Sequence, residues 1–308
     1  MTDPLFDKAA IIGLGLIGSS IARGLKKRGL ASAVTGFDAS SDVREAADAL
    51  GFCDAIASNA EDAVREADLV VLAVPVGAMA AAAQSIAPFL TEGAILTDVG
   101  SVKAAVVRDI AALLPDYVSF VPGHPVAGTE HSGPEAGFAD LFDGRWCVIT
   151  PCDTSPKQAV KKIVALWVGL GSTVEIMTPE HHDIVLAITS HIPHLIAYNI
   201  VGTAADLEDV TQSEVIKFSA GGFRDFTRIA ASDPVMWRDV FLNNKDAVLE
   251  VLGRFSEDLA ALQRMIRWDD GPALQDHFTR TRKIRRGIID AGQDTPDADF
   301  GRPHKDGD

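Results

Sequence analysis

The sequence predicts an α/β domain with a doubly wound, mostly parallel sheet, followed by an all-helical domain. Over the first 178 residues, short apolar runs typical of strands alternate with helical patterns. After residue 178 no convincing alternating strand pattern appears. The length of 308 residues fits two domains. We expect these domains at residues 1–178 and 179–290, and a disordered tail with Asp, Pro and Gly at residues 291–308.

The composition is acidic, because 28 Lys and Arg stand against 43 Asp and Glu and give a net charge of −15. Such a chain has no general attraction for nucleic-acid phosphates or anionic membranes, so we expect neither as a partner. The cysteines Cys53, Cys147 and Cys152 form no CxxC pair, and the acidic N-terminus does not resemble a signal peptide. Both features favour a reducing, cytoplasmic location.

Two stretches, residues 69–91 and 184–205, contain no Asp, Glu, Lys or Arg and are long enough to span a membrane. The first is interrupted by Pro75 and Gly77, which favour a strand, a turn and then a helix. The second contains His191, which would be costly in lipid. We therefore expect both stretches to be buried inside the protein.

Gly13, Gly15 and Gly18 form a GxGxxG motif between a short apolar run and a helical pattern, the context that a dinucleotide site needs. Gly13 permits a tight turn, Gly15 lets the backbone approach a pyrophosphate, and Gly18 lets the helix pack on the strand. Leu16 and Ile17 begin the helix, whose N-terminus attracts the diphosphate. The motif predicts a Rossmann-type sheet.

Asp38 follows the apolar run at residues 33–37 and lies twenty residues after Gly18. An acid there can accept hydrogen bonds from the adenosine ribose and repels a 2′-phosphate, so the sequence favours NAD over NADP. Further strands are predicted at residues 69–74, 94–97, 118–121, 146–150 and 173–177. Ligands bind beyond the carboxyl ends of such strands. The residues expected there to contact the cofactor are Val74, Pro75 and Ser101.

His124 follows a predicted strand at this same edge. An imidazole there can hydrogen-bond a substrate hydroxyl while a hydride leaves the same carbon. A structural alternative remains open for each of two residues. His124 could be a structural histidine in a loop, and Ser101 could be the N-cap of a helix that begins near Val102. Asp98, Ser101 and His124 also resemble a hydrolase triad. However, the chain lacks a GxSxG elbow and carries a strong dinucleotide motif, so we do not expect a hydrolase.

Four histidines gather at residues 181–194 and raise the question of a metal site: His181, His182, His191 and His194. Pro193 would distort the turn between the last two, and no acid is paired with them. We therefore expect no metal.

Arg224 and Arg228 are four residues apart in the segment GGFRDFTR and share a side if that segment is helical. Arginine is the natural bidentate partner of a carboxylate, although a surface ion pair with Asp225 is the alternative. Further on, apolar residues recur at steps of four and three and predict a packed helix seam. A bundle core and a subunit interface remain equal interpretations of that seam, which consists of Val248, Leu252, Phe255, Leu259, Leu262 and Ile266.

Four segments together resemble the prephenate dehydrogenase family of tyrosine biosynthesis, which includes arogenate and cyclohexadienyl dehydrogenases. They are residues 98–103 (DVGSVK), 123–133 (GHPVAGTEHSG), 190–194 (SHIPH) and 221–228 (GGFRDFTR). The resemblance extends from the glycine motif to about residue 287. It implies NAD-dependent oxidative decarboxylation of prephenate to 4-hydroxyphenylpyruvate, CO2 and NADH, with arogenate, which would give tyrosine, as a candidate second substrate.

The resemblance also implies roles for individual residues. His124 would hydrogen-bond the C4 hydroxyl of the substrate, and Ser101 would orient that histidine beside the nicotinamide. Arg228 would bind the ring carboxylate. The remaining substrate-binding residues that it implies are His194 and His191 on one helix, Glu130 and Arg224 as a gate pair, and Thr129.

Because the helical domain of this family dimerises, the resemblance favours a subunit interface for the apolar seam and implies a homodimer. An arogenate-specific dehydrogenase is the nearest alternative function. Another two-domain NAD enzyme, such as a β-hydroxyacid dehydrogenase or an imine reductase, would lack the histidine–proline and GGFRDFTR segments. A non-catalytic NAD sensor would keep the glycine motif and Asp38 without needing both His124 and Arg228.

Overall fold

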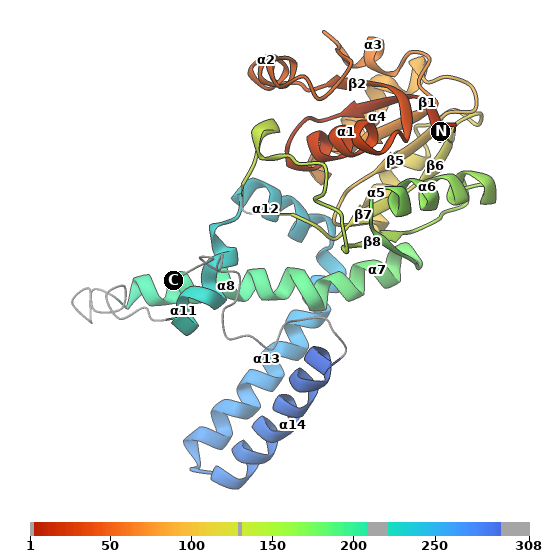
Figure 1. Cartoon of the computed structure of the whole chain (residues 1–308). Coiled ribbons are helices and arrows are strands. Elements are labelled where there is room, and N and C mark those ends of the chain that lie inside the picture. Colours follow the sequence, from red (N-terminus) through yellow and green to blue (C-terminus); the bar gives the residue numbers. More distant parts are fainter. Residues whose placement is uncertain (1–2, 129–130, 208–220, 291–308) are drawn as a thin grey trace. The chain divides into compact units, whose positions relative to one another are not determined.

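A computed structural model of the chain describes residues 3–128, 131–207 and 221–290 (Figure 1). It contains two compact units. The first unit comprises Met1–Leu195 and Ala231–Val248, and the second comprises Ile196–Ala230 and Leu249–Asp308. The expected tail at residues 291–308 lies outside the described residues. The first unit carries the glycine motif and all the histidines at residues 181–194.

The main sheet of the first unit has six parallel strands in the order β3-β2-β1-β4-β5-β6. They are β1 (Phe6–Ile12), β2 (Ala31–Phe37), β3 (Ala55–Ile56), β4 (Leu69–Leu72), β5 (Ile95–Asp98) and β6 (Ser119–Val121). The strand order reverses at β1, between β2 and β4. In a doubly wound sheet this reversal marks the crevice where ligands bind, so the topology confirms the predicted Rossmann-type arrangement.

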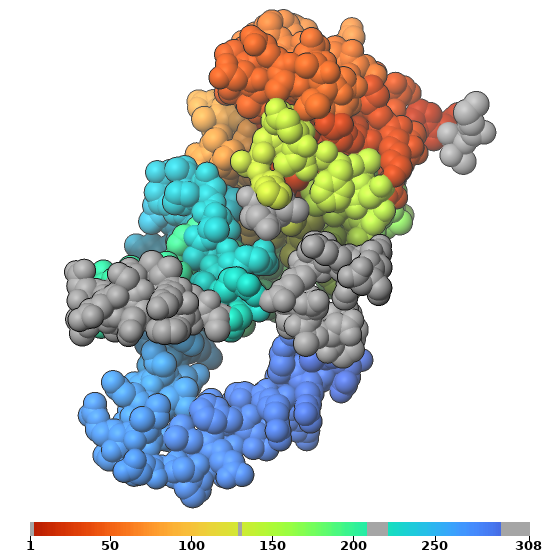
Figure 2. Space-filling model, turned by 60° about the vertical axis from the view of Figure 1, so that its left-hand side comes forward, coloured from red at the N-terminus to blue at the C-terminus, as the bar shows by residue number. Residues whose placement is uncertain are grey.

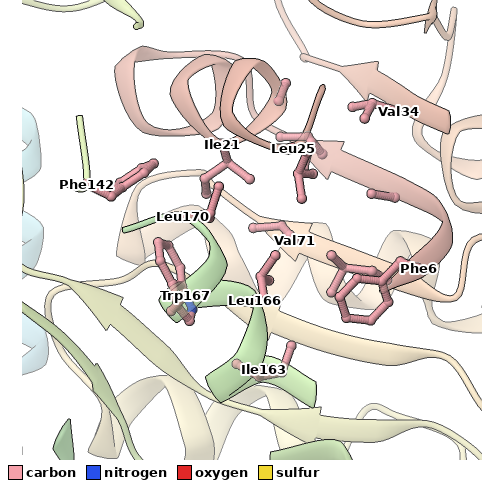
Figure 3. Packing of buried hydrophobic residues seen from close by; sticks show 14 of the residues in the cluster. Phe6, Ile21, Leu25, Val34, Val71, Phe142, Ile163, Leu166, Trp167 and Leu170 are labelled. Atoms are coloured by element: carbon pink, nitrogen blue, oxygen red, sulfur yellow. The ribbon is translucent and has the colours of Figure 1, made fainter. Parts of the chain in front are cut away.

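Helices lie on both faces of this sheet, and β1 supplies alternate residues to each face. Ala9 and Ile11 belong to one buried cluster, and Ala10 and Ile12 to the other. Figure 3 shows the first cluster, in which Ile21 of α1 and Trp167 of α6 belong to one group of side chains with Val71 of β4. The helices of the two layers are α1 (Leu16–Arg28), α2 (Ser41–Leu50), α3 (Ala60–Val64), α4 (Val76–Ile86), α5 (Ala104–Ala111) and α6 (Lys157–Gly169), with a 3-10 turn η1 (Ala87–Phe89) after α4.

A separate three-stranded sheet consists of β7 (Gly123–Pro125), β8 (Trp146–Ile149) and β9 (Thr173–Ile176). Strand β7 runs antiparallel to β8, and β8 runs parallel to β9. The sequence predicted residues 146–150 and 173–177 as strands of the one mostly parallel sheet and predicted no strand at residues 123–125, so the prediction is wrong in this part. Pro122, which has no N–H to donate to a ladder, separates β6 from β7, and the chain then pairs with a new partner. His124 consequently lies in a strand rather than in a loop.

The segment between β7 and β8 covers part of the first helical layer. Its 3-10 turn η2 (Pro134–Ala136) packs on α1 and α2, and the backbone N–H of Phe138 donates to Ser20 Oγ at 3.1 Å. In Figure 2 it appears as yellow-green residues against the red and orange part of the surface.

One long apolar helical stretch, Pro179–Asp206, follows the small sheet. It consists of α7 (Pro179–Leu186), a π-helical turn η3 (Ala187–His191) and α8 (Ile192–Asp206). Thr178 caps it, since its side chain accepts a hydrogen bond from His181 N. The π-helical turn accommodates Pro193, whose ring would otherwise clash with the carbonyl four residues earlier. The distortion therefore lies one turn before its predicted place between His191 and His194, where α8 is regular. Among the described residues it is the one helix long and apolar enough to cross a membrane, a test that core helices also pass. Only 28% of its apolar window is buried, so the expected burial of residues 184–205 is wrong for the single chain.

Five helical elements follow α8 in the described chain. Helix α12 (Pro234–Asn243) packs on α4 within the first unit. The second unit contains α11 (Gly221–Thr227), most of its 3-10 continuation η4 (Arg228–Ala231), most of α13 (Lys245–Arg267) and α14 (Gly271–Asp290). Leu259, Leu262 and Ile266 of the predicted seam line an apolar groove with Phe278 of α14. Helix α14 has no buried residue, so this apolar surface is uncovered in a single chain.

Candidate active site

The glycine motif forms the turn between β1 and α1. Gly13 has φ +99°, and a Cβ on it would lie 2.4 Å from the Ala73 carbonyl oxygen. A Cβ on Gly18 would lie 1.9 Å from the Gly13 carbonyl oxygen, so both positions exclude a side chain. In contrast, a Cβ on Gly15 would meet nothing within 4 Å. Open space at Gly15 is what a closely approaching pyrophosphate requires.

Helix α1 begins directly after this turn, with Leu16 and Ile17 as its first residues. Its N-terminus has neither a side-chain cap nor an acidic residue in the first turn. The first amide groups of a helix lack intrahelical partners, so those of α1 can bind an anion. The turn and the helix together fit the diphosphate of a dinucleotide.

Asp38 lies at the carboxyl end of β2 and holds the glycine turn in place. Its Oδ2 accepts a hydrogen bond from Leu14 N at 2.9 Å, and its Oδ1 accepts one from Ser40 N at 2.9 Å. Arg44 Nη1 donates to the Asp38 carbonyl oxygen at 2.7 Å. The half-buried carboxylate thus lies beside the glycine turn, where ribose hydroxyls can donate to its remaining lone pairs.

The other expected cofactor contacts also lie at the carboxyl ends of strands. Val74 and Pro75 lie two and three residues after the end of β4, and a Cβ on Gly13 would lie 2.9 Å from Val74 Cγ1. Ser101 follows β5, but it is not the N-cap of the next helix. Helix α5 begins at Ala104 rather than near Val102, and its N-cap residue is Lys103, without a side-chain cap of its own. The capping interpretation of Ser101 is therefore wrong.

A carboxylate from a distant helix caps α5 instead. Asp183 of α7 accepts hydrogen bonds from Lys103 N at 2.7 Å and from Ala104 N at 2.9 Å. These are the unpartnered amide groups of a helix N-terminus, which favour a negative charge. The contact fixes α7 on α5.

Lys103 and Asp98 form an ion pair whose side chains are fully buried. Lys103 Nζ also donates to the Gly123 carbonyl oxygen at 2.8 Å, and Gly123 N donates to Asp98 Oδ1 at 3.3 Å. Burial lowers the pKa of Lys103, and the neighbouring Asp98 opposes that shift. The pair therefore holds the backbone immediately before His124 from both sides.

His124 lies on β7 opposite Val148 of β8 and is 8% exposed. Its Nδ1 is 2.8 Å from His182 Nε2, and the two rings meet edge to face with centroids 5.1 Å apart. Burial holds the pKa of His124 well below 6.5, and the nearby His182 and Lys103 lower it further. The imidazole is therefore neutral at pH 7.

His182 continues the contacts of His124 toward Asp183. Its ring is fully buried, and its Nδ1 is 2.8 Å from Asp183 Oδ1. Burial lowers the pKa of His182, while the hydrogen bond to Asp183 raises it. The hydrolase-like triad is not formed, because His182 contacts His124 while Asp98 pairs with Lys103.

His191 occupies the end of the π-helical turn and is fully buried. Asn244 Nδ2 lies 3.0 Å from His191 Nδ1 and also donates to the Asp183 carbonyl oxygen at 2.8 Å. Burial lowers the pKa of His191 to about 4, against a smaller opposing effect of Asp183. An uncharged His191 is therefore part of the same buried network as Asp183.

His194 stacks on Trp237 of α12, with ring centroids 3.7 Å apart and an interplanar angle of 24°. Its Nδ1 donates to the Ser190 carbonyl oxygen at 2.9 Å. The stacking fixes the ring plane, and the half-buried position keeps the side chain accessible to a ligand.

Four predicted site residues do not belong to the described part of the first unit. Arg224 and Arg228 belong to the second unit, and Arg224 makes the ion pair with Asp225 that was the alternative interpretation, at 3.3 Å. Thr129 and Glu130 lie outside the described residues. Among those described, no group of three or more His, Cys, Asp or Glu side chains could hold a metal ion.

Sequence reasoning missed the supporting residues Lys103, Asp183, Asn244 and Trp237. His182 entered it only as part of a histidine cluster. A signal was available for one contact, because an acid directly follows His182 in the chain. The other contacts depend on the packing of α7 on α5 and of α12 on α4, which no local sequence pattern specifies.

Two family models match the chain. "Prephenate dehydrogenase, nucleotide-binding domain" matches residues 21–176, and "Prephenate dehydrogenase, dimerization domain" matches residues 178–280. A cyclohexadienyl dehydrogenase of Zymomonas mobilis is 45% identical over 284 residues, which are 92% of this chain and 97% of the relative. A prephenate dehydrogenase of Bacillus subtilis is 36% identical over 283 residues, 92% of this chain and 76% of the relative.

Solved structures give the same result. A crystal structure of prephenate dehydrogenase from A. aeolicus, in complex with hydroxyphenyl propionate and NAD+, aligns with a TM-score of 0.86 at 34% identity. The alignment covers 92% of this chain and 98% of that one. Synechocystis arogenate dehydrogenase aligns with a TM-score of 0.78 at 26% identity, covering 91% of this chain and 99% of that one.

Proposed function

Because this chain belongs to the prephenate dehydrogenase family, we propose that it converts prephenate and NAD+ to 4-hydroxyphenylpyruvate, CO2 and NADH. The observation that carries the proposal is the position of the buried His124, whose strand lies beside the carboxyl end of β5. A Cβ on the preceding Gly123 would lie 3.3 Å from the Asp98 carbonyl oxygen, at the edge of the sheet where ligands bind. A neutral imidazole there can accept a proton from a substrate hydroxyl.

The reaction moves one proton and two electron pairs. NAD+, when bound, accepts the hydride from C4 of the substrate. His124 accepts the proton of the C4 hydroxyl as that carbon becomes a carbonyl. Loss of CO2 from C1 then sends its electron pair into the ring, which becomes aromatic. His124 returns the proton to the phenolate oxygen, so the enzyme ends the cycle unchanged.

The cofactor site in this proposal consists of the glycine turn and the strand ends around it. Gly13, Gly15, Gly18, Leu16 and Ile17 hold the diphosphate, and Asp38 accepts hydrogen bonds from the ribose. Val74, Pro75 and Ser101 line the path toward the nicotinamide. Support comes from the open face of Gly15 and from the position of the Asp38 carboxylate.

The substrate contacts follow the chemistry of a dicarboxylate. His194 contacts the side chain of the substrate, and His191 supports the same helix. An arginine forms charge-assisted, bidentate hydrogen bonds with a carboxylate, which suits Arg228 for the ring carboxylate. The gate over the site consists of Glu130 and Arg224, with Thr129 beside it. Support for these roles is the identity of the residues within the segments 123–133 and 221–228.

We propose residues 1–178 and 179–290 as the two domains, because the two family models meet between residues 176 and 178. The protein acts as a cytoplasmic homodimer without a nucleic-acid or membrane partner. Support for the dimer is the match to a dimerization domain and the uncovered apolar groove of α13 and α14.

A second candidate function is oxidation of arogenate to tyrosine. It is favoured by the similarity to a cyclohexadienyl dehydrogenase and to Synechocystis arogenate dehydrogenase. The two substrates differ by a keto or an amino group on the side chain. Steady-state NADH formation with each substrate separately, first with NAD+ and then with NADP+, tests both candidates. The ratio of the two kcat/KM values identifies the preferred substrate, and turnover with arogenate alone would replace the prephenate proposal by the second candidate.

A further inference from the structure

A continuous series of buried contacts leads from His124 to the N-terminus of α5. His124 Nδ1 contacts His182 Nε2 at 2.8 Å, and His182 Nδ1 contacts Asp183 Oδ1 at 2.8 Å. Asp183 in turn accepts the amide hydrogens of Lys103 and Ala104. His182 is fully buried and Asp183 is 4% exposed, so neither contact competes with bulk water. No step of the proposed reaction uses these two residues directly.

The direction of each hydrogen bond in this series follows from the residue at its end, Asp183. The Asp183 carboxylate can only accept, and two backbone N–H groups already donate to it. His182 must therefore carry its proton on Nδ1 to bond with it. In a neutral His182 the other nitrogen, Nε2, is then an acceptor, so the proton between the two rings belongs to His124 Nδ1.

We propose that His182 and Asp183 are positioning residues that hold His124 as the Nδ1–H tautomer, with Nε2 bare and available to the substrate. The inference rests on the proposed function only for the identity of the group that Nε2 meets, the C4 hydroxyl. A His124 carrying its proton on Nε2 would present a donor where the reaction requires an acceptor. His182 and Asp183, which we call the relay, thereby select the reactive tautomer of the catalytic base His124.

The charged groups around the two rings favour this neutral arrangement. Lys103 and His191 face His124, and Lys103, Asp98 and Asp183 face His182. The opposite polarity would require His182 to hold protons on both nitrogens. Burial lowers the pKa of His182 and disfavours that doubly protonated ring. The buried Lys103 adds repulsion to a cation on either histidine.

Two amide substitutions at His182 separate the two ends of the relay. The amide of His182→Asn reaches the position of Nδ1 and can still donate to Asp183, but it loses the contact with His124. The amide of His182→Gln reaches the position of Nε2 and can still accept from His124 Nδ1. His181→Asn is the matched control, since His181 is exposed on the same helix and its side chain makes none of these contacts.

The direct test is ¹⁵N NMR of the histidine-labelled full-length protein without substrate, because two-bond ¹H–¹⁵N couplings distinguish the tautomers. We expect the Nδ1–H tautomer for His124 in the wild type, in His181→Asn and in His182→Gln, and loss of that preference in His182→Asn. An Nε2–H tautomer of His124 in the wild type overturns the inference. The same result in His182→Asn as in the wild type also overturns it. The spectrum needs no turnover, so this outcome is independent of whether prephenate is the substrate.

Kinetics provide the second readout. We expect His182→Asn to lower kcat by at least about 10-fold, and by no more than the roughly 10⁴-fold effect of a triad histidine in the wrong tautomer. KM should be unchanged, and His182→Gln should recover most of the lost kcat. If His182 has only a structural role, both substitutions should lower the thermal stability. The kcat values of His182→Asn and His182→Gln, and the acidic limbs of their pH profiles, should then be the same.

Discussion

Lys103 extends from the start of α5 to the buried carboxylate of Asp98 and donates a hydrogen bond to the Gly123 carbonyl oxygen on the way. Both side chains of this pair are completely inaccessible to solvent. The pair is thus a support for the strand that presents His124, since Gly123 precedes His124 directly. Loss of this pair should therefore lower the free energy of unfolding more than it weakens substrate binding.

Replacing Lys103 with methionine should lower the free energy of unfolding by about 3–5 kcal/mol, because it leaves the Asp98 carboxylate buried and uncompensated. Urea denaturation of the purified variant measures the change. The double variant Lys103→Met with Asp98→Leu should recover part of the loss, since replacing both partners removes the unpaired charge. A single variant within about 1 kcal/mol of the wild type would show that the pair does not support the strand.

His124→Asn should reduce kcat by roughly 10² to 10⁴-fold, the range typical of a positioned acid–base group, while KM stays nearly constant. Steady-state NADH formation under saturating NAD+ measures both constants. The matched control is His131→Asn, an exposed histidine in the segment after β7. A variant that retains the wild-type kcat would remove His124 from the chemical step.

Arg228→Gln should mainly raise KM for the substrate, because a charge-assisted bidentate contact with the ring carboxylate is lost. A contact of that kind contributes about 1.5–3 kcal/mol, which corresponds to roughly 10- to 100-fold in KM. Arg238→Gln, at an exposed arginine paired with Asp239, serves as the control for loss of a positive charge. An unchanged KM in Arg228→Gln would mean that another group holds the carboxylate.

Asp38→Asn should shift cofactor preference toward NADP, because the negative charge that repels a 2′-phosphate is removed. We expect the ratio of kcat/KM for NAD+ over NADP+ to fall by at least about 10-fold, the cost of one charged hydrogen bond. The amide still offers an oxygen to Leu14 N, so the glycine turn keeps one of its supports. Asp42→Asn, an exposed acid on α2, is the control. An unaltered ratio would place the ribose contact elsewhere.

Stability should fall as the pH drops from 7 toward 5. The pKa of His191 is about 4 in the folded protein, below the value near 6.5 expected after unfolding. The unfolded state therefore binds more protons in this window, and the stability present above pH 6.5 is lost on acidification. For His191 alone the loss by pH 5 is about 2 kcal/mol.

His124 and His182, whose pKa values are also lowered, act in the same direction. Denaturation midpoints at several pH values measure this slope, and His191→Gln should make it shallower. A slope that is unchanged in His191→Gln would show that the folded protein does not hold His191 neutral. Because the pKa of His124 lies well below 6.5, the acidic limb of kcat/KM should also lie below pH 6.5.

Local spacing was enough to predict the glycine turn and the carboxylate beside it. A GxGxxG turn has few conformations compatible with its strand and helix, so Gly13, Gly15, Gly18 and Asp38 occupy the positions that the sequence indicates. His124 was also correctly placed at the edge of the sheet. Its location in a second sheet was not foreseen, since the pairing of β7 with β8 joins segments more than twenty residues apart.

The partners of His124 could not be predicted from any short segment. His182 is 58 residues away in sequence, and it belongs to α7, whose Asp183 caps α5. The same cap explains why the N-cap role expected for Ser101 failed. A helix N-terminus needs an acceptor, and the sequence does not show that the acceptor comes from another helix.

The most direct test of the central claim is the stoichiometry of the products that the purified protein forms from prephenate and NAD+. NADH, CO2 and 4-hydroxyphenylpyruvate should appear in equal amounts, and His124→Asn should slow all three together. If the protein binds NAD+ but forms none of these products from prephenate, the proposed reaction is contradicted, while the glycine turn and Asp38 remain a dinucleotide site.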